Sequence, residues 1–165
     1  RHCTRHRNRA LMEAYMEWHW NGYELTDDRG RMDTQAVLAL LRETYWAGDR
    51  PPEVQLRAFE HSVCFSVFHG GQQVAFARAI SDHATFAWIA DVIVAAEHRG
   101  RGVGQWMIRS LLEHPALRTR SQWLATRDAH KLYERFGFER FEAMRKGPPM
   151  AGISPIVPSS LSNEI

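Results

Sequence analysis

Two stretches in the N-terminal half of the chain carry apolar residues at helical spacing. Asp33-Thr34 can cap the first helix, and the apolar positions that follow are Val37, Leu38, Leu40, Leu41 and Tyr45. Pro51-Pro52 can open the second, which continues through Val54, Leu56 and Phe59. A strand is predicted before them, over residues 23–26. Residues 1–20 are interpreted as a short helix with the apolar members Leu11, Tyr15, Trp18 and Trp20.

Beyond residue 60 the period changes to that of strands. Residues 63–68, 74–80 and 85–94 are predicted to be strands joined by tight turns, the first of them at His69-Gly70-Gly71. The pattern then predicts a helix over residues 102–112, a strand over 123–125, a helix over 129–136 and a last strand over 138–143.

This order of elements predicts a mixed α/β (α+β) layer, with an antiparallel start and a crossover through the helix at 102–112. We expect residues 1–21 to form an N-terminal extension and residues 22–146 to form one domain. Residues 147–165 begin with Gly-Pro-Pro and are rich in Ser and Pro, so a disordered tail is predicted there.

Charge and cysteine content change this picture little. The formal net charge is +2, from 21 Lys and Arg against 19 Asp and Glu. A basic leader at residues 1–9 can be an arm for nucleic acid or a membrane surface, or a solvated extension. The chain lacks the interleaved aromatic residues and the wide basic face that a nucleic-acid surface needs. Cys3 and Cys64 have no metal-ligand spacing, and no apolar run approaches the roughly 18 residues of a membrane span. We expect a cytoplasmic protein with no nucleic-acid, membrane or metal partner.

The chemistry is concentrated in residues 91–104, where an apolar strand runs into a Gly-rich turn that opens a helix. Glycines let the backbone approach a ligand, and free amides at a helix start favour a phosphate. Arg99 and Arg101 add positive charge. The dinucleotide fingerprint is excluded because Gln105 stands where its third glycine belongs, and a P-loop sequence is absent. Tight packing of strand against helix is the other interpretation of these glycines.

Two motifs make the pattern specific. The first is Arg99-x-x-Gly102-x-Gly104 after Val92-Ile93-Val94, and the second runs from Leu124 to Phe138 and contains Ala129-His130-Lys131-Leu132-Tyr133 and Phe136-Gly137-Phe138. Together they resemble the acyl-CoA motifs of the GNAT (Gcn5-related N-acetyltransferase) superfamily, over roughly residues 22–146. Tyr45-Trp46-Ala47, Arg50-Pro51 and Ala90-Asp91-Val92 are similar to a large, uncharacterised bacterial and fungal group within it.

The resemblance implies the GNAT fold, a mixed sheet of about six to seven strands with about four helices. It also implies acetyl-CoA as co-substrate. The strand before the turn would splay from its neighbour, so that its backbone at Val92, Ile93 and Val94 could bind the pantetheine arm. The cradle for the pyrophosphate would be Arg99, Gly100, Arg101, Gly102, Val103, Gly104 and Gln105.

Tyr133 matches the tyrosine that, in the family, protonates the departing CoA thiolate; a core aromatic is the alternative. Asp91 is a candidate for the base. Strand alternation would place it on the face with Ile89 and Ile93, and a satisfied structural carboxylate is the alternative. Glu97 and His98 are interpreted as solvated. Many members have an Asn that contacts CoA where this chain has Thr126.

The loop between the first two helices usually binds the acceptor in this family. Here Trp46 and Arg50 could bind a ligand with an apolar part and a carboxylate, or could be a packed Trp and a surface ion pair. The resemblance implies transfer of an acetyl or short acyl group to a primary amine, most simply of a small molecule. A CoA-binding sensor without turnover is the alternative function. GNAT proteins are often dimers, which makes a homodimer a candidate assembly, although the sequence shows no interface.

Overall fold

One seven-stranded sheet runs through the part of the chain that the computed structural model describes, residues 2–7 and 14–147. The strands lie side by side in the order of the sequence, antiparallel from β1 to β6, and only β7 pairs in parallel, with β6. The strands are β1 (His2–Arg7), β2 (Ala14–Trp20), β3 (Tyr23–Thr26), β4 (Val63–His69), β5 (Gln72–Ser81), β6 (Phe86–Val94) and β7 (Ser121–Trp123). The predicted fold class, a mixed sheet that is antiparallel at the start, is confirmed.

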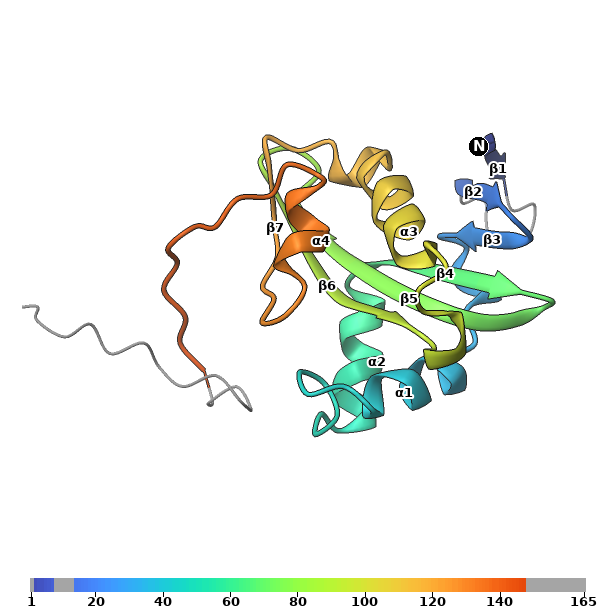
Figure 1. The fold of residues 1–165 in the computed structure, drawn as a ribbon, viewed down its shortest axis with the longest axis horizontal. Helices are drawn as coiled ribbons and strands as arrows, with labels where there is room; N and C mark the ends of the chain where they lie inside the picture. Colours follow the sequence, from blue (N-terminus) through green and yellow to red (C-terminus); the bar gives the residue numbers. More distant parts are fainter. Residues whose placement is uncertain (1, 8–13, 148–165) are drawn as a thin grey trace, which may run out of the picture.

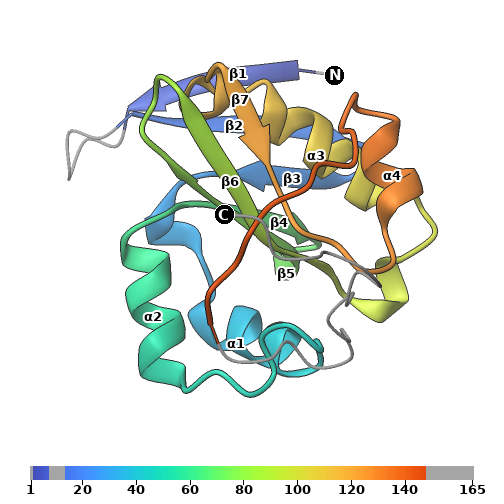
Figure 2. The same ribbon diagram turned by 90° about the vertical axis from the view of Figure 1, so that its left-hand side faces the viewer.

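Helices cover both faces of this sheet (Figure 1). The pair α1 (Thr34–Arg42) and α2 (Pro52–Glu60) lies on one face, whereas α3 (Val103–Leu112) and α4 (His130–Glu134) lie on the other, as the turned view in Figure 2 also shows. Three short 3-10 turns join these elements: η1 (Arg29–Arg31), η2 (Ala96–His98) and η3 (Pro115–Leu117). Among the described residues, no helix is long and apolar enough to cross a membrane.

The two faces of the sheet have separate apolar cores. Leu25, Phe65 and Met107 belong to the core under α3, which also takes in Trp18 of β2. The core under α1 and α2 contains Val37, Leu41, Phe59, Phe76 and Ile93. Helix α1 begins where it was predicted, because the Asp33 carboxylate accepts a hydrogen bond from the backbone N–H of Ala36 at 3.0 Å.

The predicted helix over residues 1–20 is wrong. Strands β1 and β2 form an antiparallel pair there, and β2 continues the sheet next to β3. Met16, Trp18 and Trp20 all face the core under α3, which is the period of a strand. Leu11 and Arg9 lie outside the described residues, as does the side chain of Cys3.

The predicted last strand, Phe138–Ala143, is also wrong, since residues 138–146 have no regular secondary structure. This arm is exposed from Glu139 onward, with the Phe141 side chain 76% exposed. A strand needs a partner, and β7 beside the arm is only three residues long. The predicted tail lies beyond residue 147, outside the described part of the chain.

Candidate functional site

The Gly-rich turn links the end of β6 to the start of α3 through η2. Gly100 and Gly102 adopt left-handed backbone angles, with φ of +72° and +85°, and Gly102 is the N-cap of α3. A residue with a side chain is strained at such angles. Backbone geometry alone is therefore enough to require glycine at positions 100 and 102. The chain must turn sharply there so that α3 can begin directly after β6.

Free amides collect at this turn. The first amide bonded within α3 is that of Trp106, which donates to the Gly102 carbonyl at 3.0 Å, so Val103, Gly104 and Gln105 precede the helical ladder. The Arg99 amide is already used, because it donates to the Ala96 carbonyl at 3.2 Å. Its side chain donates from Nε to the Val94 carbonyl at 2.8 Å. Arg99 and Arg101 are both exposed, so their charges face solvent beside the start of α3.

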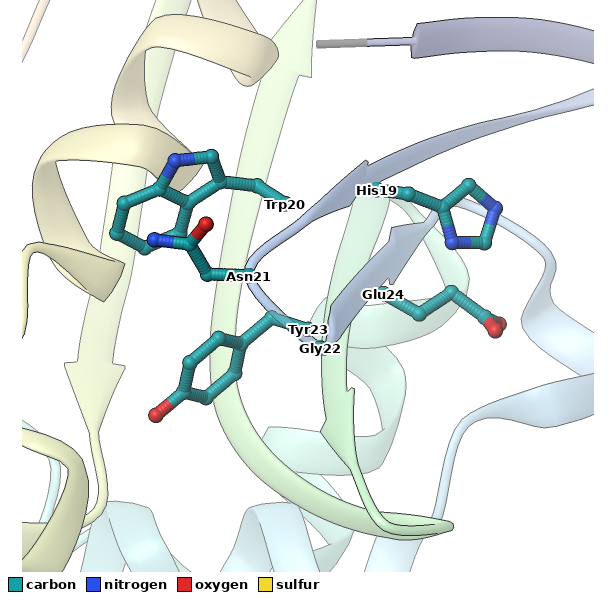
Figure 3. Close-up of a pocket in the computed structure, with 6 residues that line it drawn as sticks. All are labelled: His19, Trp20, Asn21, Gly22, Tyr23 and Glu24. Carbon is teal, nitrogen blue, oxygen red and sulfur yellow. The ribbon is translucent and has the colours of Figure 1, made fainter.

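The hairpin between β2 and β3 packs against the turn, which the sequence did not suggest. A Cβ at Gly102 would lie 3.1 Å from Cη2 of Trp20, so this glycine is needed for contact as well as for backbone angle. Figure 3 shows Trp20, Asn21 and Tyr23 on one side of the hairpin and His19 and Glu24 on the other. Residues 19–24 of this hairpin line a hollow of about 410 Å³, and none of the predicted site residues is among them.

His98 is not the solvated residue that was predicted. It is half-buried, and its Nδ1 lies 2.9 Å from the hydroxyl of Tyr23 in a hydrogen bond. The rings of His69 and His98 are 5.3 Å apart, and that of His69 is 4.6 Å from Tyr23. These three rings pack together and connect η2, which leads into the Gly-rich turn, to β3 and β4. Only the apolar pattern of β3 marked Tyr23, and nothing in the sequence linked it to a residue 75 positions away.

Strand β6 has a free edge where the turn approaches. It pairs with β7 only from Phe86 to Trp88, opposite Ser121 to Trp123. From Ile89 to Val94 its hydrogen-bonded neighbour is β5, and no described strand lies on the other side. The edge of β6 beyond Trp88 therefore has no described strand beside it, although the Val94 carbonyl accepts a hydrogen bond from Arg99.

A β-bulge interrupts β6 at Asp91. Phe76 pairs with Ile93 and Arg78 with Ala90, so the single residue between them on β5 faces two residues, 91 and 92, on β6. Asp91 has a φ of +53°. The predicted alternation is wrong here: Ile89 packs in the core under α3, whereas Ile93 packs in the core under α1 and α2.

Asp91 is paired rather than free. Arg50 donates from Nη1 to both carboxylate oxygens at 3.0 Å, and Arg78 donates from Nε to Oδ2 at 2.6 Å. The Asp91 side chain is 1% exposed. These contacts favour the alternative of a satisfied structural carboxylate over a base. They bring together two residues, Asp91 and Arg50, that were selected for separate roles.

Tyr133 lies on α4 and is 8% exposed. Burial, followed by the influence of Tyr45 and Asp128, raises the pKa of its hydroxyl to about 12. Its ring packs against Phe138 at 5.9 Å, and no described residue hydrogen-bonds to its hydroxyl. The hydroxyl therefore keeps its proton at neutral pH. Thr126, by contrast, is engaged locally, because its Oγ1 accepts a hydrogen bond from the Ala129 amide at 3.0 Å.

The loop between α1 and α2 meets the start of α4. The Arg127 guanidinium stacks on the ring of Tyr45 at 3.7 Å, and the Arg127 amide donates to the Tyr45 hydroxyl at 3.3 Å. Trp46 is half-buried and packs edge-on against Tyr45, with a buried Nε1 that has no partner among the described residues. A hollow of about 300 Å³ beside this loop is lined by Arg50 but not by Trp46.

Comparisons with known proteins agree with one another. The model of the acetyltransferase (GNAT) domain family matches residues 60–140. A solved GNAT-family protein from Xanthomonas campestris pv. campestris, described as a candidate acetyltransferase, is 40% identical with a TM-score of 0.73, over 79% of this chain and 96% of that one. A candidate acetyltransferase of the fungus Gibberella zeae is 28% identical over 161 residues, which cover 83% of this chain and 89% of the relative.

More distant structures share the fold alone. Glucosamine-6-phosphate N-acetyltransferase from Arabidopsis thaliana is 16% identical with a TM-score of 0.57, over 76% of this chain and 97% of that one.

Proposed function

This chain belongs to the GNAT family of acetyltransferases, and from that premise we propose that it transfers an acetyl or short acyl group from acyl-CoA to a primary amine of a small molecule. When bound, acyl-CoA supplies an activated thioester and a thiolate leaving group. The protein's part is to hold that molecule, to orient the amine beside it and to supply a proton to the thiolate, while the attacking nitrogen gives up one proton to water as the amide forms.

The observation that carries the proposal is the continuity of the free edge of β6 with the turn at Gly100–Gly102 and the amides of α3. A Cβ at Gly100 would meet no atom within 4 Å, so the turn is open to a ligand on that side. Exposed Arg99 and Arg101 add positive charge to the helix start. An elongated ligand with an amide-bearing arm and a pyrophosphate fits this arrangement.

We assign the proton donor to Tyr133. A phenol with a pKa of about 12 is fully protonated at neutral pH, and its hydroxyl is not committed to a described residue. Tyr133 lies on α4, just after Arg127, which stacks on Tyr45, so the donor belongs to the segment that meets the loop where an acceptor would bind. Trp46 on that loop offers a half-buried apolar ring, although its indole N–H is turned into the protein.

The cofactor part of the proposal is tested by thermal unfolding with acetyl-CoA, because a ligand that binds only the folded chain raises its melting temperature. Arg99→Glu should largely abolish the shift, since it reverses a charge beside the pyrophosphate. Arg57→Glu is the matched control. It changes the net charge by the same amount at an exposed position on α2, on the face of the sheet opposite α3. No shift in the wild type at millimolar acetyl-CoA would contradict the proposal.

Turnover is tested separately by screening a library of primary amines for release of the CoA thiol. A wild-type protein that binds acetyl-CoA and accepts no amine would favour the sensor function. A shift produced by nucleic acid instead of acetyl-CoA would point to the nucleic-acid alternative.

A further inference from the structure

A buried ion cluster joins three separate elements under α1 and α2. Its centre is the Asp91 carboxylate in the bulge of β6, which accepts hydrogen bonds from Arg50 of the α1–α2 loop and Arg78 of β5. The exposed fractions of the three side chains are 1% for Asp91, 12% for Arg78 and 30% for Arg50. Such a cluster is a strong positional constraint, because removing Asp91 leaves two guanidinium groups without their carboxylate, and removing either arginine leaves the buried Asp91 with one cation in place of two.

The cluster extends into the loop backbone. Arg50 donates from Nη2 to the Trp46 carbonyl at 3.1 Å. Gln55 of α2, which is 3% exposed, donates to the Ala47 carbonyl at 3.2 Å and lies within 3.4 Å of Arg50 Nη1. On the other side, Arg78 donates from Nη1 to the Ser62 hydroxyl at 3.1 Å. The carbonyls of Trp46 and Ala47 are therefore fixed relative to β6 through two side chains.

The bulge itself explains why a carboxylate stands at this position. In the left-handed region Asp is among the least strained residues after glycine. The bulge turns the Asp91 side chain toward Arg78 and Arg50, on the face of Ile93, and away from the face of Ile89. Both carboxylate oxygens are then engaged by guanidinium groups, and the side chain is closed to solvent. In these surroundings Asp91 can hold the two arginine side chains in place, but it cannot exchange protons with a substrate.

We propose that Asp91 and Arg50 are positioning residues: Asp91 holds Arg50, and Arg50 sets the place of the Trp46 segment relative to the free edge of β6. This inference rests on the proposed function, since the Trp46 segment is the part of the loop assigned to the amine. Asp91 transfers no proton in this arrangement. Its contribution is to keep the acceptor loop at a fixed distance from the strand that binds the acyl donor.

The test compares Arg50→Met, Asp91→Asn and the double variant with the wild type. Arg42→Met is the matched control. Arg42 is exposed and, like Arg50, lines the hollow beside the α1–α2 loop, but it is not paired with Asp91. Hydrogen exchange of residues 44–50 needs no substrate. Arg50→Met and Asp91→Asn should each raise exchange in this segment at least about tenfold, with β4 and β5 unchanged, whereas Arg42→Met should not. Unchanged exchange in Arg50→Met would overturn the proposal.

Kinetics with the best amine from the screen separate an anchor from a base. An anchor predicts that KM for the amine rises at least about tenfold in either single variant, that kcat falls less, and that the double variant is no worse than Arg50→Met. It also predicts that Asp91→Asn keeps the wild-type pH profile. A base predicts a loss concentrated in kcat, a changed acidic limb and losses that add, and that result would overturn the proposal.

The proposed function and this inference fail separately. Absence of an acetyl-CoA shift in the wild type counts against the acyltransferase and leaves the exchange result standing. Retention of the shift in Arg50→Met and Asp91→Asn is expected, because neither residue belongs to the cradle at residues 99–105.

Discussion

The Tyr133 side chain combines deep burial with a hydroxyl that no described residue binds. Tyr133→Phe removes that hydroxyl and almost no packing volume, so folding and acetyl-CoA binding should persist. If Tyr133 supplies the proton to the thiolate, turnover should fall roughly 10²- to 10⁴-fold. The loss should appear in kcat, because the interaction forms mainly in the transition state.

Tyr45→Phe is the control for Tyr133→Phe, because it is the same substitution on a neighbouring ring. The Tyr45 hydroxyl accepts a bond from the Arg127 amide, so its loss should change turnover only a few-fold. Steady-state kinetics with one amine acceptor compare the two variants directly. A Tyr133→Phe enzyme with full activity would remove Tyr133 from the mechanism.

Single residues of the site were identifiable from the sequence more reliably than their roles. The motifs selected Tyr133, Arg99 and Gly102, and the structure places the last two at one turn. Asp91 was also selected, yet its face of the sheet was predicted wrongly because one extra residue in β6 reverses the alternation beyond it. Its pairing with Arg50 was equally hidden, since the two residues are 41 positions apart.

At the scale of elements, three glycines of one motif should respond differently to alanine. Gly102→Ala meets both a left-handed angle and Trp20 at 3.1 Å, so we expect a loss of about 1–2 kcal/mol in the free energy of unfolding. Gly100→Ala meets the angle alone, with no atom within 4 Å, and should lose no more than Gly102→Ala. Gly104 lies in α3, and a Cβ there would be at an ordinary 3.7 Å from the Val94 side chain. Gly104→Ala should therefore raise the free energy of unfolding by about 0.5–1 kcal/mol.

Denaturant unfolding of the three glycine variants measures these differences. Equal losses at Gly102 and Gly104 would show that backbone angle and the Trp20 contact do not determine the response. Acetyl-CoA affinity in the same variants then reports how much of the motif serves the ligand beyond the packing of the turn.

Elements with a clear period and clear ends were predictable. Helices α1 and α2, strands β4, β5 and β6, and helix α3 all lie where period, caps and turns indicated. The N-terminal pair failed because Tyr15 and Trp18 are three positions apart, as in a helix, while the buried side is formed by Met16, Trp18 and Trp20. The last strand failed because its existence depends on a neighbour, and no pattern within residues 138–143 shows that β7 ends at Trp123.

For the whole molecule, stability at alkaline pH follows from two buried acids. Burial raises the pKa of Tyr133 from 10.0 to about 12 and that of Cys64 from 9.0 to about 11. Both folded values exceed the unfolded ones, so the stabilisation is complete below the unfolded pKa and is lost as the pH rises through the folded pKa. Tyr133 therefore acts between about pH 10 and 12, and Cys64 acts between about 9 and 11.

Denaturant unfolding across this alkaline range compares the wild type with Tyr133→Phe. A shift of two pKa units corresponds to about 3 kcal/mol, and the wild type should lose up to that amount more than the variant by about pH 12. Parallel curves for the two proteins would contradict the raised pKa of Tyr133. Cys64→Ala in both backgrounds separates the contribution of the thiol.

The long reach of the Arg50–Asp91 pair has a consequence for the order of folding. Strands β4, β5 and β6 are joined by short turns, so their pairing closes short loops and can form early. The contact between residues 50 and 91 closes a loop of 41 positions, and that between Tyr23 and His98 one of 75. We therefore expect the α1–α2 loop and the Tyr23–His98 contact to form after the β4–β5–β6 meander, late in folding, and to be lost early in unfolding.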